Sequence, residues 1–143
     1  MAKSNKDNRG GRRKSRPELT EAEWAIMKIV WQNEPCAAGT VQEILQASKN
    51  WAYGTVKGAM DRMVEKGFLK VERIRNLQLF SSAISEAQAR KTELKKTLKR
   101  AFDGALTPMV QFLIENENFS PGQLKQIRKF IQQAERKKKG QDT

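Results

Sequence analysis

The sequence lacks histidine altogether and contains a single cysteine, Cys36. Without histidine the chain has neither the commonest metal ligand nor the commonest general base, which excludes histidine-dependent catalysis. Clustered carboxylates and a phosphate-cradling glycine loop are missing too, so we expect no metal, no cofactor and no enzymatic activity. One cysteine allows no internal disulfide, which fits a reducing cytoplasm. Cys36 has no second thiol beside it, and we expect it to be buried or idle rather than a thiol sensor.

Long apolar runs are also missing. No stretch approaches the roughly 20 residues that a membrane helix needs. The basic N-terminal segment is not followed by an apolar stretch, so it does not read as a secretory signal. We therefore expect a cytoplasmic protein with no membrane insertion.

Acidic residues are few beside basic ones: 16 against 28 in a chain of 143, a net charge of +12. This balance favours a polyanionic partner, nucleic acid before an anionic membrane surface. Residues 1–17 are strongly basic and almost devoid of apolar side chains, which predicts a disordered basic arm. The arm either adds phosphate contacts or only keeps the chain soluble.

Three segments with helical periodicity follow the arm. Thr20-Glu-Ala-Glu23 fits a capping box at the start of the first, which should end at Pro35. Thr40-Val-Gln-Glu43 fits a second capping box before a short amphipathic helix. The third helix is expected to begin near Tyr53 or Gly54 and to end at Gly67, a residue suited to the left-handed position after a helix.

The spacing of apolar residues then changes from that of helices to that of two β-strands. Residues 68–74 and 77–80 read as two short strands, with Asn76 in the connection able to take positive φ. Three helices followed by a hairpin are the order of a winged helix-turn-helix. We therefore predict a mainly α protein with a winged-helix DNA-binding domain over residues 18–84.

The second helix of a helix-turn-helix enters the major groove of DNA. If Val56 faces the core, 100° per residue places a predominantly polar set of residues on the open side. Asp61 and Glu65 there would be repelled by phosphate, so we expect them to pair with Lys57, Arg62 or Lys66, or to face away. The candidate DNA-binding residues of this helix are Tyr53, Gly54, Thr55, Lys57, Gly58 and Arg62.

Further residues of interest lie at the tip of the hairpin and just before the third helix. At the tip of the hairpin, Arg73, Arg75 and Asn76 are candidates for contact with the DNA backbone or minor groove. Trp51, before the third helix, is expected to pack beneath it and fix the turn. For Tyr53 the sequence leaves a backbone contact and simple packing equally open.

The C-terminal segment, residues 85–139, reads as a helical dimerisation module. Ser85-Glu-Ala-Gln88 fits a capping box, and Ser120-Pro-Gly-Gln123 places Ser at the N-cap and Pro at the first helical position. Each helix has one apolar stripe, and a segment this small rarely buries enough surface to fold alone. A second copy would complete the core, so we predict a two-fold symmetric homodimer. The dimerisation residues are Leu94, Leu98, Phe102, Leu106, Met109, Val110, Leu113, Leu124, Ile127 and Ile131.

Two other functions are compatible with these features. A sequence-neutral nucleic-acid binder would act through charge alone, with affinity that falls steeply as salt rises. A winged helix can also serve as a protein-interaction module, although the basic arm and the basic groove face argue against it.

Three stretches resemble the penicillinase repressor family, which includes repressors of β-lactamase and methicillin-resistance genes and copper-responsive repressors. They are LTEAEWAIMKIVW, NWAYGTVKGAMDRMVEKGFL and FDGALTPMVQFLIENENFSPGQLKQIRKFI, between Leu19 and Ile131. The resemblance implies a homodimeric winged-helix repressor that occupies a palindromic operator. It places Thr55 and Lys57 among the groove-facing residues, although Gly54 and Gly58 stand where the family commonly has longer polar side chains.

The resemblance also implies a way of losing the dimer. In the antibiotic-sensing members a membrane-bound zinc peptidase signals, and the repressor is cut in its C-terminal module, typically between Asn and Phe. The matching bond here joins Gln111 and Phe112. The paired cysteines of the copper-responsive members have no counterpart in this chain, which sets copper sensing through that site aside.

Overall fold

The computed structural model describes residues 18–142, so the expected basic arm at 1–17 lies outside the described residues. The chain divides into two compact units, residues 1–94 and 95–143. The division falls inside a helix, after Leu94. The described helices lack the combination of length and apolar character that a membrane span requires.

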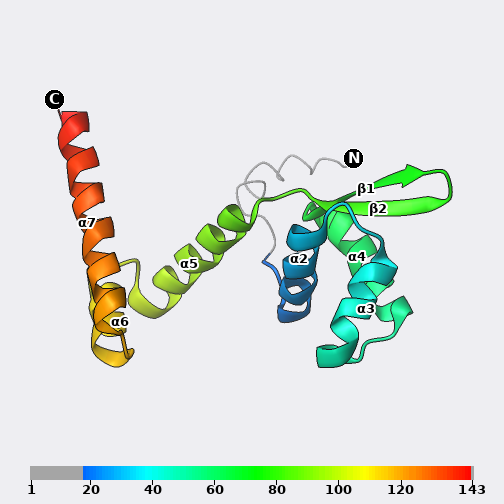
Figure 1. Ribbon diagram of the computed structural model, residues 1–143, viewed down its shortest axis with the longest axis horizontal. Helices are drawn as coiled ribbons and strands as arrows, with labels where there is room; N and C mark the ends of the chain where they lie inside the picture. The colour runs from blue at the N-terminus through cyan, green and yellow to red at the C-terminus, as the bar shows by residue number, and fades with distance from the viewer. Residues whose placement is uncertain (1–17, 143) are drawn as a thin grey trace, which may run out of the picture. The chain divides into compact units, whose positions relative to one another are not determined.

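The first unit is a winged helix-turn-helix (Figure 1). Strands β1 (Leu69–Ile74) and β2 (Leu77–Ser82) form an antiparallel hairpin in which Leu69 pairs with Ser82 and Ile74 with Leu77. The predicted order of three helices and a hairpin is confirmed. The elements are α2 (Glu21–Asn33), α3 (Ala38–Lys49), α4 (Tyr53–Lys66), β1 (Leu69–Ile74), β2 (Leu77–Ser82) and the first part of α5 (Glu86–Phe102).

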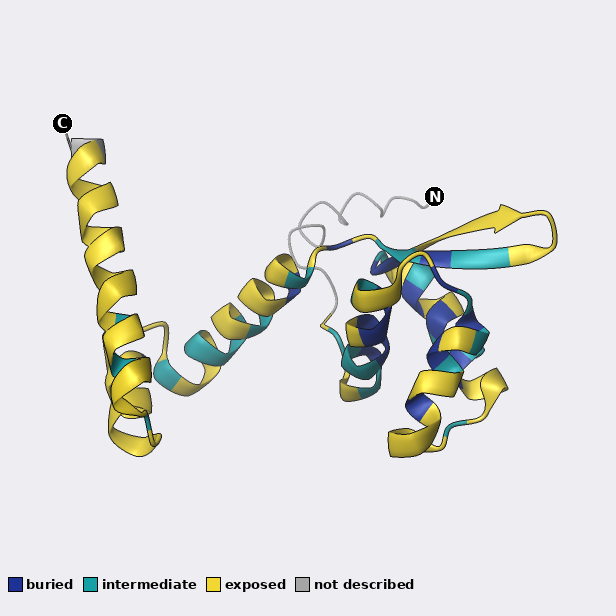
Figure 2. Cartoon of the chain, viewed as in Figure 1, coloured by how far each residue is buried: buried dark blue, intermediate teal, exposed yellow. Residues whose placement is uncertain are grey.

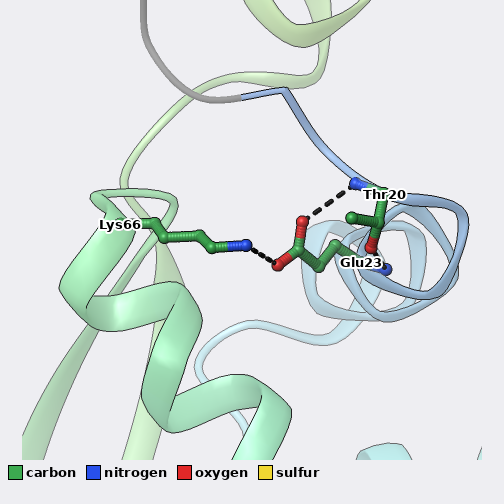
Figure 3. A network of polar contacts seen from close by, with 3 residues as sticks. All are labelled: Thr20, Glu23 and Lys66. Atoms are coloured by element: carbon green, nitrogen blue, oxygen red, sulfur yellow. Dashed lines mark hydrogen bonds and ion pairs between the residues drawn. The ribbon is translucent and has the colours of Figure 1, made fainter.

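The N-terminus of α2 has the predicted capping box. The Oγ1 of Thr20 accepts from the backbone N–H of Glu23 at 3.2 Å, and the backbone N–H of Thr20 donates to Glu23 Oε1 at 2.9 Å. The second carboxylate oxygen of Glu23 accepts from Lys66 Nζ at 2.6 Å (Figure 3). One buried carboxylate therefore caps α2 and links it to the end of α4.

The core of the first unit lies between α2, α3, α4 and the base of the hairpin. Figure 2 shows buried positions concentrated on these elements within the unit. Burying these side chains removes much of their apolar surface from water, and each contributes about 1.5–3 kcal/mol when fully buried. The largest fully buried side chains are Phe68, Phe80, Ile26, Met27, Met60, Met63, Leu69, Val30, Val41 and Val56.

Cys36, in the loop between α2 and α3, also belongs to this core and is 5% exposed. Its backbone forms an antiparallel bridge with Phe80, with N–H to O distances of 3.0 and 2.7 Å. The loop thus adds a second short pairing beside that of β1 with β2, which the sequence did not indicate. Burial, and secondly the nearby charge of Glu34, raises the pKa of the Cys36 thiol. The expectation of a buried cysteine is confirmed.

Two local predictions are wrong. The capping box at Thr40 is absent because α3 already begins at Ala38, with Ala37 as a cap that has no side-chain bond. Ala38 is 3% exposed, so core packing moves the start of the helix three residues earlier, from a cap at Thr40 to one at Ala37. In the hairpin turn Arg75, not Asn76, takes positive φ, at 60°. A positive φ at the first of two turn residues is the pattern of a type II′ turn.

The start of α5 is anchored in the first unit. Trp31 Nε1 donates to the backbone oxygen of Ile84 at 3.0 Å, and Ala89 is buried in the core. The predicted capping box is present, since the backbone N–H of Gln88 donates to Ser85 Oγ at 3.0 Å.

The second unit contains the end of α5, α6 (Leu106–Asn116) and α7 (Pro121–Asp142). The predicted cap of α7 is confirmed: the backbone N–H of Gln123 donates to Ser120 Oγ at 3.1 Å. Among residues 95–140, whose burial is described, only Met109 is buried, and most positions are exposed (Figure 2).

Candidate nucleic-acid interface

The turn between α3 and α4 is held by local contacts. Asn50 ends α3 with φ at 55°, and Trp51 packs against the core, as predicted. The backbone oxygen of Trp51 accepts from Gln42 Nε2 at 3.1 Å, and Lys49 Nζ lies 5.9 Å from the centre of its ring. These contacts set the direction in which α4 leaves the turn.

Helix α4 has one apolar face and one polar face. Val56, Met60 and Met63 are fully buried at 0% exposure and dock the helix onto the core. Tyr53, the first residue of the helix, is 52% exposed. The open side, which is the side the periodicity predicted, carries the exposed residues Gly54, Thr55, Asp61 and Arg62 and the half-buried Gly58. DNA contact by these residues stays a prediction.

Neither glycine on this face is required by packing. A Cβ added at Gly54 would meet nothing within 4 Å, and one added at Gly58 would meet only Arg62 Nη1, at 3.4 Å. Because glycine has no side chain, another molecule can approach the helix backbone closely at these two positions.

Lys57 lies beside the glycines and is paired. Its Nζ contacts both carboxylate oxygens of Asp61, at 2.9 and 2.8 Å. The Lys57 side chain is 25% exposed and that of Asp61 51%. The expectation that Asp61 pairs with a neighbouring cation is confirmed. Lys66, another expected partner on α4, instead pairs with Glu23, 43 residues away in the chain, and sequence spacing holds no signal for that contact.

Burial by itself would raise the pKa of Glu23. The hydrogen bond from Lys66, the hydrogen bonds from Thr20 and the positive charge of Lys66 together outweigh it, so the pKa lies below its ordinary value of 4.5. The carboxylate is therefore ionised at neutral pH and keeps the end of α4 attached to α2.

The hairpin presents its three candidate residues, Arg73, Arg75 and Asn76, at its outer end, where all three are exposed. Figure 1 shows the tip of β1 and β2 extending beyond the helices of the first unit. Ile74 and Leu77 face each other across the turn and are 49% and 51% exposed. The tip of the hairpin therefore exposes both cationic and apolar side chains.

The predicted dimerisation residues are distributed along α5, α6 and α7. Phe102 contacts Phe112 edge to face, with ring centres 6.1 Å apart. Five of them are exposed in the single chain: Leu94, Leu106, Val110, Leu113 and Ile131. Four are half-buried, namely Leu98, Phe102, Leu124 and Ile127, and Met109 is buried. Their role in dimerisation stays a prediction.

The bond between Gln111 and Phe112 lies in the middle of α6, and both residues are exposed. Gln111 Nε2 donates to Glu115 Oε2 at 3.1 Å, within the same helix. Across the described residues, no group of three or more Cys, Asp or Glu side chains is arranged to hold a metal ion.

Comparison with known proteins finds relatives that match most of the length of this chain. The methicillin resistance regulatory protein MecI of Staphylococcus aureus (strain N315) is 23% identical over 114 residues, which cover 80% of this chain and 93% of MecI. The penicillinase repressor of Bacillus licheniformis is 22% identical over 86% of this chain and 96% of its own length. The solution structure of the DNA-binding domain of the repressor BlaI matches with a TM-score of 0.46 and 22% identity, over 51% of this chain and 89% of that one. The profile of the family described as penicillinase repressor matches residues 19–133, and the chain therefore belongs to the penicillinase repressor family.

Proposed function

We propose that this protein is a DNA-binding transcriptional repressor that acts in the cytoplasm as a homodimer on a palindromic operator. The observation that carries the proposal is the exposed polar face of α4 in a winged-helix domain, in a chain that belongs to the penicillinase repressor family. Curated relatives across most of its length are named as penicillinase repressors and methicillin resistance regulatory proteins.

In this proposal α4 enters the major groove, with its open face toward the base edges and base contacts beginning with the residues near its N-terminus. Thr55 offers a hydroxyl and a methyl group, and Lys57 offers ammonium donors to guanine or phosphate. The cations of the hairpin tip contact the neighbouring backbone or minor groove. Phosphate contacts position the protein, while the base contacts select the sequence.

The second unit supports the homodimer. Leu106, Val110 and Leu113 of α6 are 60%, 41% and 43% exposed in the single chain. Exposed apolar side chains this closely spaced are typical of a surface that another protein covers. Since most homo-oligomers are closed and two-fold symmetric, the partner we propose is a second copy of this chain.

Dimerisation is what makes operator occupancy strong. Once one half-site is bound, the second contact becomes effectively intramolecular, which adds about 10²- to 10⁴-fold to the affinity. Loss of the dimer forfeits this gain and releases the promoter.

Cleavage between Gln111 and Phe112 by a membrane-bound zinc peptidase is the proposed route to that loss. The bond lies inside α6, so cleavage requires the helix to open locally. Cutting there would separate part of α6 and all of α7 from the rest of the chain. Incubation with such a peptidase followed by mass spectrometry tests this step, and an intact chain would contradict it.

The main test is selection of bound duplexes from fragmented genomic DNA at low and moderate salt. We expect a small set of fragments that share an inverted repeat and remain bound as salt rises. Binding to all duplexes alike, with affinity that falls steeply with salt, would instead indicate a sequence-neutral nucleic-acid binder.

A further inference from the structure

The open face of α4 has a carboxylate at its centre. At 100° per residue, Gly54, Gly58, Asp61 and Glu65 fall within an arc of about 60°. Lys57 lies to one side of this stripe and Arg62 to the other. Of the four residues in the stripe, Asp61 is the first whose side chain can contact another molecule, and it is 51% exposed.

This placement matters for any helix that lies in the major groove. The phosphates line the two edges of the groove, and the base edges form its floor. The centre of the helix face meets the floor, while the flanks meet the phosphates. Arg62 is thus placed toward one anionic edge and Asp61 toward the bases, while Lys57 starts from the other flank and its Nζ is turned inward to Asp61.

A carboxylate on the floor of the groove needs a hydrogen-bond donor. The major-groove edges offer amino groups at cytosine N4 and adenine N6, and aspartate accepts characteristically from cytosine N4. Beside that cytosine, its guanine partner presents the acceptors O6 and N7. A donor placed next to Asp61 would therefore complete the recognition of one C·G pair.

Lys57 is that donor. Its Nζ lies 2.9 and 2.8 Å from the two Asp61 oxygens. An ammonium group has three N–H donors, so one remains for guanine, and a carboxylate has acceptor sites left for cytosine. We propose that Asp61 and Lys57 act as one unit that reads a single C·G base pair in each operator half-site.

The two glycines make this contact sterically feasible. Aspartate is short, so its carboxylate reaches a base edge only if the helix backbone lies close to the DNA. Beyond the Gly54 backbone there is open space, and Gly58 is approached only by the end of the Arg62 side chain. Larger side chains there would hold Asp61 away from the bases.

The ion pair also removes the electrostatic objection to a carboxylate in the groove. An isolated aspartate would be repelled by the polyanion, but the Lys57–Asp61 pair carries no net charge. Asp61 therefore adds little to overall affinity and acts mainly on the choice of base. This inference rests on the proposed operator binding and specifies how one position is read.

The test is selection from a duplex DNA library with a randomised core, using the full chain and the variants Asp61→Asn and Lys57→Gln. For the parent we expect a motif with one strongly preferred C·G pair in each half-site. Both variants should lose the preference at that same position, by about fivefold or more. Asp61→Asn should shift toward adenine, because an amide can both donate and accept at the adenine edge.

The matched control is Glu65→Gln, which removes the same charge from the same stripe further along the helix. It should leave the motif unchanged. Asp61 and Glu65 are both exposed, so thermal unfolding of these variants should match that of the parent.

Three other results would contradict the inference. If Asp61→Asn raises the affinity for every duplex without changing the motif, Asp61 acts only through charge, and the inference is wrong. If the two variants change different positions, the residues do not read one pair. If the parent selects no motif, operator recognition itself fails and this inference fails with it.

Discussion

Glu23 connects two helices that are distant in the chain. Its side chain is 9% exposed. One carboxylate oxygen accepts a hydrogen bond from the backbone N–H of Thr20, and the other accepts from Lys66 Nζ. A buried carboxylate is stable only when charged partners and hydrogen bonds compensate for its lost hydration. Since Lys66 is the last residue of α4, this contact holds the C-terminal end of the proposed DNA-reading helix (Figure 3).

We predict that Glu23→Gln lowers the free energy of unfolding by about 1 kcal/mol at neutral pH. The amide can still accept from Thr20 but loses the charge that attracts Lys66. Chemical denaturation monitored by circular dichroism measures the change. Lys66→Met should have a similar effect, and the double variant should cost less than the sum of the two. Strict additivity would contradict a direct coupling between these residues.

The same contact predicts a pH dependence. The folded-state pKa of Glu23 lies below its ordinary value of 4.5, so its contribution is complete above that value. It is lost as the pH falls through the lower folded-state pKa. The stability difference between the parent and Glu23→Gln should therefore shrink as unfolding is measured at progressively more acidic pH. A difference that stayed constant into the acidic range would contradict this assignment.

Cys36 is expected to be chemically inert in the folded protein. It is 5% exposed, and its raised pKa keeps the thiol protonated at neutral pH. We predict that its reaction with a thiol reagent is roughly tenfold slower or more in the native chain than in denaturant, because the thiolate is the reactive form. Ellman's assay in both conditions measures the ratio. Equal rates would show that the loop carrying Cys36 is open in solution.

Among the elements, α5 has an unusual position, since it begins on the winged-helix core and ends in the second unit. Ala89 is buried in that core, and Ile84, just before the helix, accepts from the indole of Trp31. The first turns of α5 are therefore part of the DNA-binding unit in structural terms.

We predict that Trp31→Phe destabilises the first unit by about 1 kcal/mol, because it removes this hydrogen bond and keeps most of the aromatic packing. Trp24→Phe is the control: Trp24 contacts Trp31 edge to face, and its indole makes no hydrogen bond among the described residues. Thermal unfolding should separate the two variants. Equal destabilisation would mean that ring packing, rather than the bond to Ile84, anchors α5.

For the whole molecule, the proposed function requires both units. The first has a complete core, whereas the second has one buried residue, Met109, within residues 95–140. A chain shortened to residues 1–94 keeps Ile84 and Ala89 and should fold. Without the second unit it should be a monomer with operator affinity about 10²- to 10⁴-fold weaker.

Sedimentation and fluorescence anisotropy test this prediction. Leu113→Glu in the full chain should have the same consequences, because it places a charge on the proposed dimer surface of α6. Lys129→Gln, an exposed change on α7, should leave both properties intact. Full affinity in the shortened chain would refute the role of the dimer.

Much of this architecture is local in origin, and local patterns in the sequence predict it. The capping boxes at Thr20 and Ser85, the cap at Ser120 and the left-handed Gly67 each depend on residues within one turn. The two faces of α4 follow from its apolar spacing, and the Lys57–Asp61 pair follows from its i, i+4 separation.

The remaining contacts depend on how the chain packs in three dimensions. The start of α3 at Ala38, the bridge between Cys36 and Phe80, and the bonds from Lys66 to Glu23 and from Trp31 to Ile84 join residues brought together by packing. Local sequence patterns are enough to predict which elements form and which faces are apolar, because both depend on near neighbours in the chain. How those elements meet was decided by which distant side chains fit together once the core had closed.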